Sequence, residues 1–99
     1  MAEKLCIVAG NCGVYVGLVE GGATQHAGDR VVMRRSRHLR RYYVAGRTGD
    51  GSVWDLATRG LDPSSPSISD VMVQPAAVTG VLRVLDVAPE VAASFGCGE

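Results

Sequence analysis

Short apolar runs separated by glycine-rich turns recur along the chain and predict a domain built mainly of β-strands. The first run, Leu5–Ala9, places Ile7 and Val8 side by side, as in a strand that is buried on both faces. The tetrapeptide Gly10–Gly13 has the composition of a turn, because glycine and asparagine accept positive φ angles. Val14–Glu20 follows directly, so the two runs are expected to form a hairpin.

Four further runs have the composition of strands. They are Arg30–Arg34, Leu39–Ala45, Ile68–Val73 and the longer Val78–Val87. Gly17 lies inside the second strand of the hairpin and indicates a bulge or a close approach of two backbones. Gly80 is expected to bend the last strand.

Two segments have helical rather than strand-like spacing. In the first, Val53, Trp54, Leu56 and Ala57 are spaced for a short helix that ends at Gly60, a residue suited to the left-handed conformation after a helix. Ser52 is its expected N-cap. The second helix is expected to begin at Pro89, to pack through Val91, Ala92 and Phe95, and to end at Gly96.

These elements predict one α+β domain over residues 1–99, with about six short strands and two short helices. We expect a small, mostly antiparallel β-sheet or a partly rolled barrel with the helices on one side. The chain is 46% hydrophobic and 20% charged, which argues against disorder. Val14–Val19 and Val78–Val87 are apolar on both faces and need cover from the rolled sheet, the helices or a second subunit, and we expect a homo-oligomer.

The net charge of zero conceals a strong asymmetry along the chain. Residues 30–47 contain seven arginines and no acidic residue, so this segment carries +7. The rest of the chain has three basic residues against ten acidic ones. Arginine binds phosphate and carboxylate through two parallel hydrogen bonds, which makes this segment the main candidate for a ligand site.

We therefore expect a non-enzymatic module that binds a phosphate-bearing ligand, a nucleotide or a cyclic nucleotide. Arginine side chains would neutralise the phosphate, and aromatic side chains would stack on the base. The candidate residues are Arg34, Arg37, Arg40, Arg41, Tyr42, Tyr43 and Trp54. If Leu39–Ala45 is a strand, each of its faces presents one guanidinium beside one phenol.

Two other interpretations of the arginines remain open. In one, they form a solvated edge or pair with acidic groups, and the protein has a structural role or binds a host protein. In the other, they bind nucleic acid without sequence specificity. The absence of a helix-turn-helix pattern and of a basic overall charge makes nucleic acid the weaker alternative.

Catalysis, metal binding and membrane insertion have little support in the sequence. Cys12, His26, His38, Asp50 and Asp55 are not joined by the spacing of a catalytic motif. The three cysteines and two histidines lack zinc-site spacing, so we expect no metal or other cofactor. The odd cysteine count and the absence of a signal peptide or membrane span predict a cytoplasmic protein without a membrane partner.

Several short motifs together resemble a small, uncharacterised protein family of bacteriophages and prophages. The resemblance rests on the hairpin motif Val14–Gly17, the arginine-rich strand from Arg37 to Tyr42, Leu56-Ala57 in a helix that ends at Gly60, Ser67-Ile68, and the strand and helix of Val84–Phe95. It implies a phage accessory protein in the cytoplasm of the bacterial host and carries over no catalytic residue. Phage proteins that sequester nucleotide signals in defence pathways are similar in being small oligomers with arginine-lined pockets.

Overall fold

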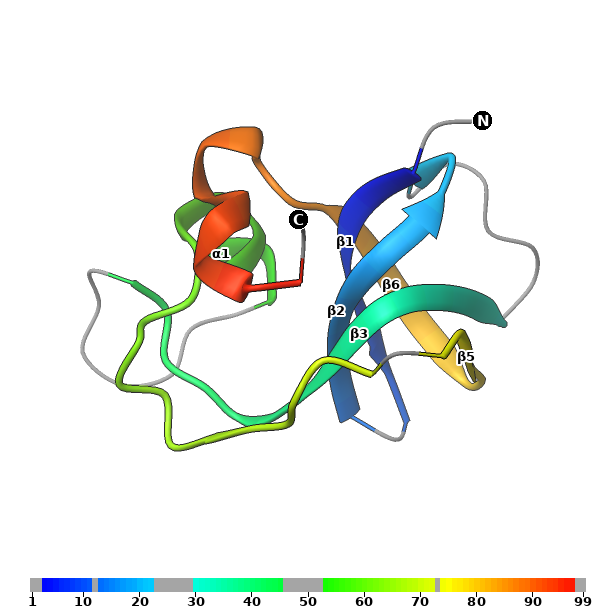
Figure 1. The fold of residues 1–99 in the computed structure, drawn as a ribbon, viewed down its shortest axis with the longest axis horizontal. Helices are drawn as coiled ribbons and strands as arrows, with labels where there is room; N and C mark the ends of the chain where they lie inside the picture. Colours follow the sequence, from blue (N-terminus) through cyan, green and yellow to red (C-terminus); the bar gives the residue numbers. More distant parts are fainter. Residues whose placement is uncertain (1–2, 12, 23–29, 46–52, 73, 98–99) are drawn as a thin grey trace.

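The computed structural model describes residues 3–11, 13–22, 30–45, 53–72 and 74–97. They form six strands and two short helices around an antiparallel sheet (Figure 1). The strands are β1 (Glu3–Gly10), β2 (Gly13–Glu20), β3 (Val31–Arg41), β4 (Ser67–Ile68), β5 (Ala76–Val78) and β6 (Val81–Asp86). The helices are α1 (Val53–Arg59) and the 3-10 helix η2 (Pro89–Phe95). The α+β class is confirmed.

The strand order is β4-β3-β2-β1-β6, and β5 pairs with the first residues of β3. The predicted hairpin of β1 and β2 is present in full register from Glu3 opposite Glu20 to Gly10 opposite Gly13. β5 and β6 have different partners, and no ladder joins the two within the described chain. The sheet is therefore open, and the predicted barrel is not confirmed.

The prediction of two separate strands at Arg30–Arg34 and Leu39–Ala45 is wrong, because a single strand, β3, runs from Val31 to Arg41. A β-bulge explains the polar middle of this strand. Val16 pairs with Arg37 and Leu18 with Arg34, so β3 contains one more residue than β2 across this interval.

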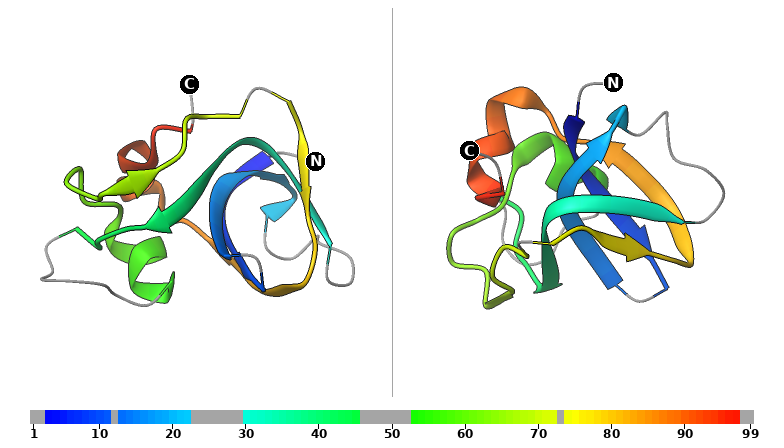
Figure 2. Two further views of the ribbon diagram at one scale, coloured as in Figure 1. Left: turned by 90° about the horizontal axis from the view of Figure 1, so that it is seen from below. Right: turned by 45° about the vertical axis from the view of Figure 1, so that its right-hand side comes forward.

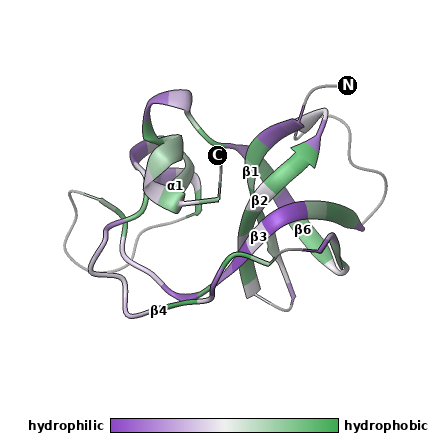
Figure 3. Ribbon diagram, viewed as in Figure 1, coloured by the Kyte–Doolittle hydropathy of each residue, from purple (hydrophilic) through white to green (hydrophobic). Residues whose placement is uncertain are grey.

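Arg35 lies inside the bulge and has a φ angle of 52°, the left-handed region that side chains other than glycine rarely adopt. Gly17 on β2 faces this bulge, and a Cβ atom there would lie 3.0 Å from Ser36 Cα. The bulge bends β3, and the strand is apolar over its first three residues and mostly hydrophilic beyond them (Figure 3).

The predicted strands Ile68–Val73 and Val78–Val87 are also corrected. The first is only the two-residue strand β4, because the chain leaves the regular ladder after Ile68. The second divides into β5 and β6 at Gly80, where φ is +66°. Gly80 therefore acts as the expected bend and allows the chain to pass from a pairing with β3 to a pairing with β1.

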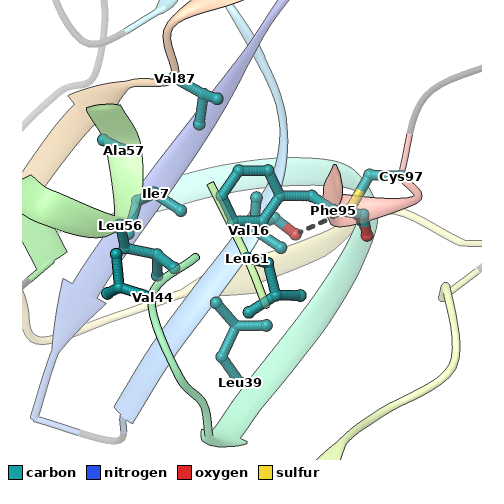
Figure 4. Packing of buried hydrophobic residues seen from close by; sticks show 10 residues of the cluster. All are labelled: Ile7, Val16, Leu39, Val44, Leu56, Ala57, Leu61, Val87, Phe95 and Cys97. Atoms are coloured by element: carbon teal, nitrogen blue, oxygen red, sulfur yellow. Dashed lines mark hydrogen bonds between the residues drawn. The ribbon is translucent and has the colours of Figure 1, made fainter. Parts of the chain in front are cut away.

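Apolar side chains are buried on both faces of the sheet. Helices α1 and η2 lie together on one side of the sheet (Figures 1 and 2). Under them lies the large cluster, made of Ile7, Val16, Leu39, Val44, Leu56, Ala57, Leu61, Val87, Phe95 and Cys97 (Figure 4). The small cluster consists entirely of strand residues: Cys6, Val8, Val19, Val31, Met33 and Val78. The two clusters account for the two-faced apolar pattern of β2, whereas Leu82 of β6 is 75% exposed.

The two helices begin and end close to the predicted positions. Gly60 follows α1 with φ +92°, and Gly96 follows η2 with φ +66°. The second helix is a 3-10 helix with Pro89 in its first turn. Ser52, the predicted N-cap of α1, lies outside the described residues. No helix in the described ranges is both long enough and apolar enough to cross a membrane.

Two cysteines, Cys6 and Cys97, are buried in the core as free thiols. The Cys6 thiol donates a hydrogen bond to Asp86 Oδ1 at 3.3 Å, and the Cys97 thiol donates to the Val16 carbonyl at 3.6 Å. Burial, helped by the Asp86 carboxylate, raises the pKa of Cys6 from 9.0 to about 12. Burial likewise raises the pKa of Cys97 to about 11.

We expect neither thiol to react quickly with a disulfide reagent in the native protein. Since the thiolate is the nucleophile, the raised pKa slows the reaction of Cys6, because it lowers the thiolate fraction at pH 8 by roughly a thousandfold relative to a free thiol. Labelling of a Cys12→Ser variant with and without denaturant checks this expectation. Fast modification of both thiols in the folded protein would contradict the burial described here.

Candidate anion-binding site

A cavity of about 360 Å³ lies between β3 and the segment from Ser69 to Thr79. Its polar lining comes from Ser36, His38, Arg40, Ser69 and Thr79. Its apolar lining comes from Met72, Ala76, Ala77 and Val78, and Tyr15 of β2 completes the wall. The cavity therefore combines one guanidinium with hydroxyl groups, two rings and an apolar surface.

The bulge in β3 determines which side chains reach the cavity. After Arg35, the alternation of the strand places Ser36, His38 and Arg40 on one face. Leu39 points to the other face and joins the large cluster. Without the extra residue, Arg40 and the core residue Leu39 would exchange faces.

Hydrogen bonds to the backbone of β3 attach the opposite wall of the cavity to this strand. The Ser69 amide donates to the His38 carbonyl at 3.0 Å, and the His38 amide donates to Ser69 Oγ at 2.7 Å. Farther along, the Met72 amide donates to the Ser36 carbonyl at 2.8 Å. The segment after β4 thus follows the edge of β3 and holds Ser69 and Met72 against the cavity.

The rings of Tyr15 and His38 are stacked, with centroids 4.4 Å apart and planes inclined by 15°. Gly13 makes room for the imidazole, because a Cβ atom at Gly13 would lie 2.8 Å from His38 Nε2. Partial burial and the positive charge of Arg40 lower the pKa of His38 below 6.5. The imidazole is therefore mainly neutral at pH 7, so Arg40 supplies the positive charge of the described lining.

Arg40 is exposed and makes no hydrogen bond or ion pair with another side chain among the described residues. Its guanidinium is therefore available to an anion that enters the cavity. Arg40 is the one residue of the predicted site that the structure places in the described lining.

Arg34 and Arg37 form contacts within the chain instead. Arg34 makes a bidentate ion pair with Glu3, with its Nε and Nη2 atoms 2.6 and 2.7 Å from the two carboxylate oxygens. This hydrogen-bonded pairing lowers the pKa of Glu3. Arg37 donates from Nε to the Ser69 carbonyl and from Nη1 to the Phe95 carbonyl, both at 2.9 Å. Arg37 thus joins β3 to the chain's C-terminal segment.

Arg41, Tyr42, Tyr43 and Trp54 do not line the described cavity. β3 ends at Arg41, so the expected alternation of guanidinium and phenol groups along Leu39–Ala45 is wrong. Tyr42 packs against the large cluster, and the Tyr43 amide donates to Ser65 Oγ at 2.9 Å. Trp54 is 60% exposed on α1.

The sequence interpretation missed Tyr15 and the wall from Ser69 to Thr79, and considered His38 only as a candidate base. Tyr15 could have been identified from its pairing with His38 in the β2–β3 ladder. That pairing depends on the strand register, which the bulge shifts and which the sequence alone does not reveal. Of the candidate catalytic residues, Cys12, His26 and Asp50 lie outside the described residues, and Asp55 is on α1. The described residues contain no group of three or more potential metal-binding His, Cys, Asp or Glu residues.

Comparison with known proteins gives no relative from which a function could be transferred. No protein-family model, curated protein or solved structure matches this chain. The resemblance to a phage family therefore stays a prediction, and the functional argument depends on the chemistry of the cavity.

Proposed function

We propose that this protein is a non-enzymatic binding module for a small phosphate-bearing ligand of the nucleotide type. The observation that carries the proposal is the single cavity wall on which Arg40 lies beside the stacked rings of Tyr15 and His38. A guanidinium is well suited to a phosphate, and the apolar and aromatic lining is suited to a base. The lining hydroxyl of Thr79 offers a hydrogen bond to a ribose.

Binding fits this arrangement better than catalysis. A hydroxyl nucleophile needs a base within hydrogen-bonding distance. The His38 ring makes no hydrogen bond to a lining hydroxyl in the described chain, and the Ser69 hydroxyl instead accepts one from the His38 backbone amide. We therefore propose a ligand that is bound in the cavity without being transformed.

The biological setting is part of the same proposal. A phage accessory protein in the bacterial cytoplasm that sequesters a nucleotide signal would act against host defence, as the sequence resemblance implies. The predicted homo-oligomer is part of the proposal as well. Sedimentation of the purified protein determines the oligomeric state separately.

The two alternative functions, binding of an acidic host protein and binding of nucleic acid, have less support than the proposed one. Arg34, Arg35 and Arg37 each contact another part of the same chain, through the Glu3 carboxylate and backbone carbonyls. Fewer arginines are then available for an acidic host protein or for a nucleic-acid backbone. A nucleic-acid binder would show an affinity that falls steeply with salt.

The proposal predicts that Arg40→Ala weakens nucleotide binding by roughly 10- to 100-fold, as expected for loss of a charge-assisted hydrogen bond. The readout is the rise in the unfolding temperature of the protein with adenosine or guanosine monophosphate, since a ligand that binds the folded state stabilises it. Arg41→Ala, the neighbouring exposed arginine outside the lining, is the matched control and should retain the wild-type response. Equal responses of the wild type and both variants would contradict the assignment of Arg40.

A further inference from the structure

We infer that the preferred ligand is a mononucleotide with a single phosphate, and that nucleoside polyphosphates and cyclic dinucleotides bind more weakly. This inference rests on the proposed function and specifies the ligand class for the same cavity. It depends on two properties of the lining, its positive charge and its volume.

The first property is the small amount of positive charge in the cavity. Among the described lining residues, Arg40 is the one arginine, and lysine is absent. Arg37 lies behind the wall, where its guanidinium is occupied by the carbonyls of Ser69 and Phe95. His38 adds little charge at pH 7, because partial burial and Arg40 lower its pKa.

One guanidinium can bind one phosphate group through two hydrogen bonds. Each additional phosphate of a diphosphate or triphosphate would lose water without gaining a positive partner in the described lining. Removing an unpaired charge from water is strongly unfavourable. The charge of the cavity therefore favours a ligand with a single phosphate group.

The second property is size. A cavity of about 360 Å³ lies near the lower end of the roughly 300–1,000 Å³ range of small-molecule sites. This volume suits one base, one ribose and one phosphate. A cyclic dinucleotide doubles each of these parts and would leave half of the molecule outside the cavity.

The apolar wall indicates that the base contributes to binding. Met72, Ala76 and Val78 present an apolar surface across from the polar face of β3. A free phosphate would leave this surface in contact with water, whereas a purine would cover it. A 5′-monophosphate and a 3′,5′-cyclic monophosphate share the required chemistry, and the experiment below separates them.

Titration calorimetry at pH 7.5 with a panel of defined probes tests the inference. The adenine series consists of adenosine, AMP, cyclic AMP, ADP, ATP and cyclic di-AMP, with the matching guanine compounds and inorganic phosphate beside it. We expect AMP or cyclic AMP, or the guanine counterpart, to bind at least about 10-fold more tightly than every other member of its series. Whichever of AMP and cyclic AMP binds more tightly shows whether the ligand is a 5′-monophosphate or a 3′,5′-cyclic monophosphate.

The outcomes separate this inference from the proposed function. Equal or tighter binding of ADP, ATP, cyclic di-AMP or a guanine equivalent would overturn the preference for one phosphate and leave the binding module intact. Binding of inorganic phosphate as tightly as the mononucleotides would overturn the role of the base. Failure of the entire panel would overturn the proposed function itself. Arg40→Ala should abolish the advantage of AMP over adenosine, and Arg41→Ala should preserve it.

Discussion

Replacing Phe95 with alanine is expected to lower the free energy of unfolding by about 3–5 kcal/mol. The Phe95 side chain is fully buried, at the end of η2, and lies within the large cluster between the helices and the sheet (Figure 4). Its removal would leave a cavity in this cluster, where residues of β1, β2, β3 and α1 come together with others from the segments between them. A domain of this size has a total stability of roughly 5–15 kcal/mol, so the variant should be close to unfolding at 37 °C.

Trp54→Ala is the matched control for this prediction. It also removes a large aromatic side chain, but Trp54 is 60% exposed on α1. Its effect on stability should stay within about 0.5 kcal/mol. Urea unfolding followed by circular dichroism compares the two variants without relying on tryptophan fluorescence. A loss of stability as large for Trp54→Ala as for Phe95→Ala would contradict the packing described here.

Arg37→Ala is expected to lower the free energy of unfolding by about 2–4 kcal/mol. The guanidinium of this half-buried side chain satisfies the Ser69 and Phe95 carbonyls, which lie in different parts of the chain. Hydrogen bonds to a charged group contribute about 1.5–3 kcal/mol each, and the two bonds share one side chain. Arg37→Lys should recover little of the loss, because an ammonium lacks the planar, two-sided geometry of the guanidinium.

Two comparisons distinguish this structural role from a general effect of charge. Arg41→Ala removes the same charge from an exposed position on β3 and should leave stability nearly unchanged. Hydrogen exchange at residues 95–97 should increase in Arg37→Ala and remain slow in Arg41→Ala, because Arg37 holds this segment. Unchanged exchange in both variants would show that Arg37 does not anchor the C-terminal segment.

Local patterns predicted much of the fold. The apolar residues of Leu5–Ala9, the turn at Gly10–Gly13 and the glycine after α1 act over a few residues, and the structure agrees with each of them. The bulge in β3 was not predictable in this way. Arg35 adopts a positive φ without being glycine, and Gly17 faces it from a strand that lies more than ten residues away in the sequence.

The candidate site was predicted less well than the fold, and the reason is physical. Charge density identified the arginine segment, but the role of each arginine depends on partners distant in the sequence. Glu3 lies 31 residues from Arg34, and Phe95 lies 58 residues from Arg37. Arg40 had no feature in the sequence that distinguished it from Arg41, because only the alternation after the bulge places it in the cavity.

The most direct test of the central claim is to map a bound mononucleotide onto the protein by NMR. AMP or GMP is titrated into isotopically labelled protein, and chemical shifts of backbone and aromatic groups are followed. We predict the largest changes at Tyr15, His38 and Thr79 around the cavity, with the exposed indole of Trp54 unchanged. Changes concentrated at Trp54 and Tyr43, or no change at the cavity residues at saturating nucleotide, would contradict the claim that this cavity is the binding site.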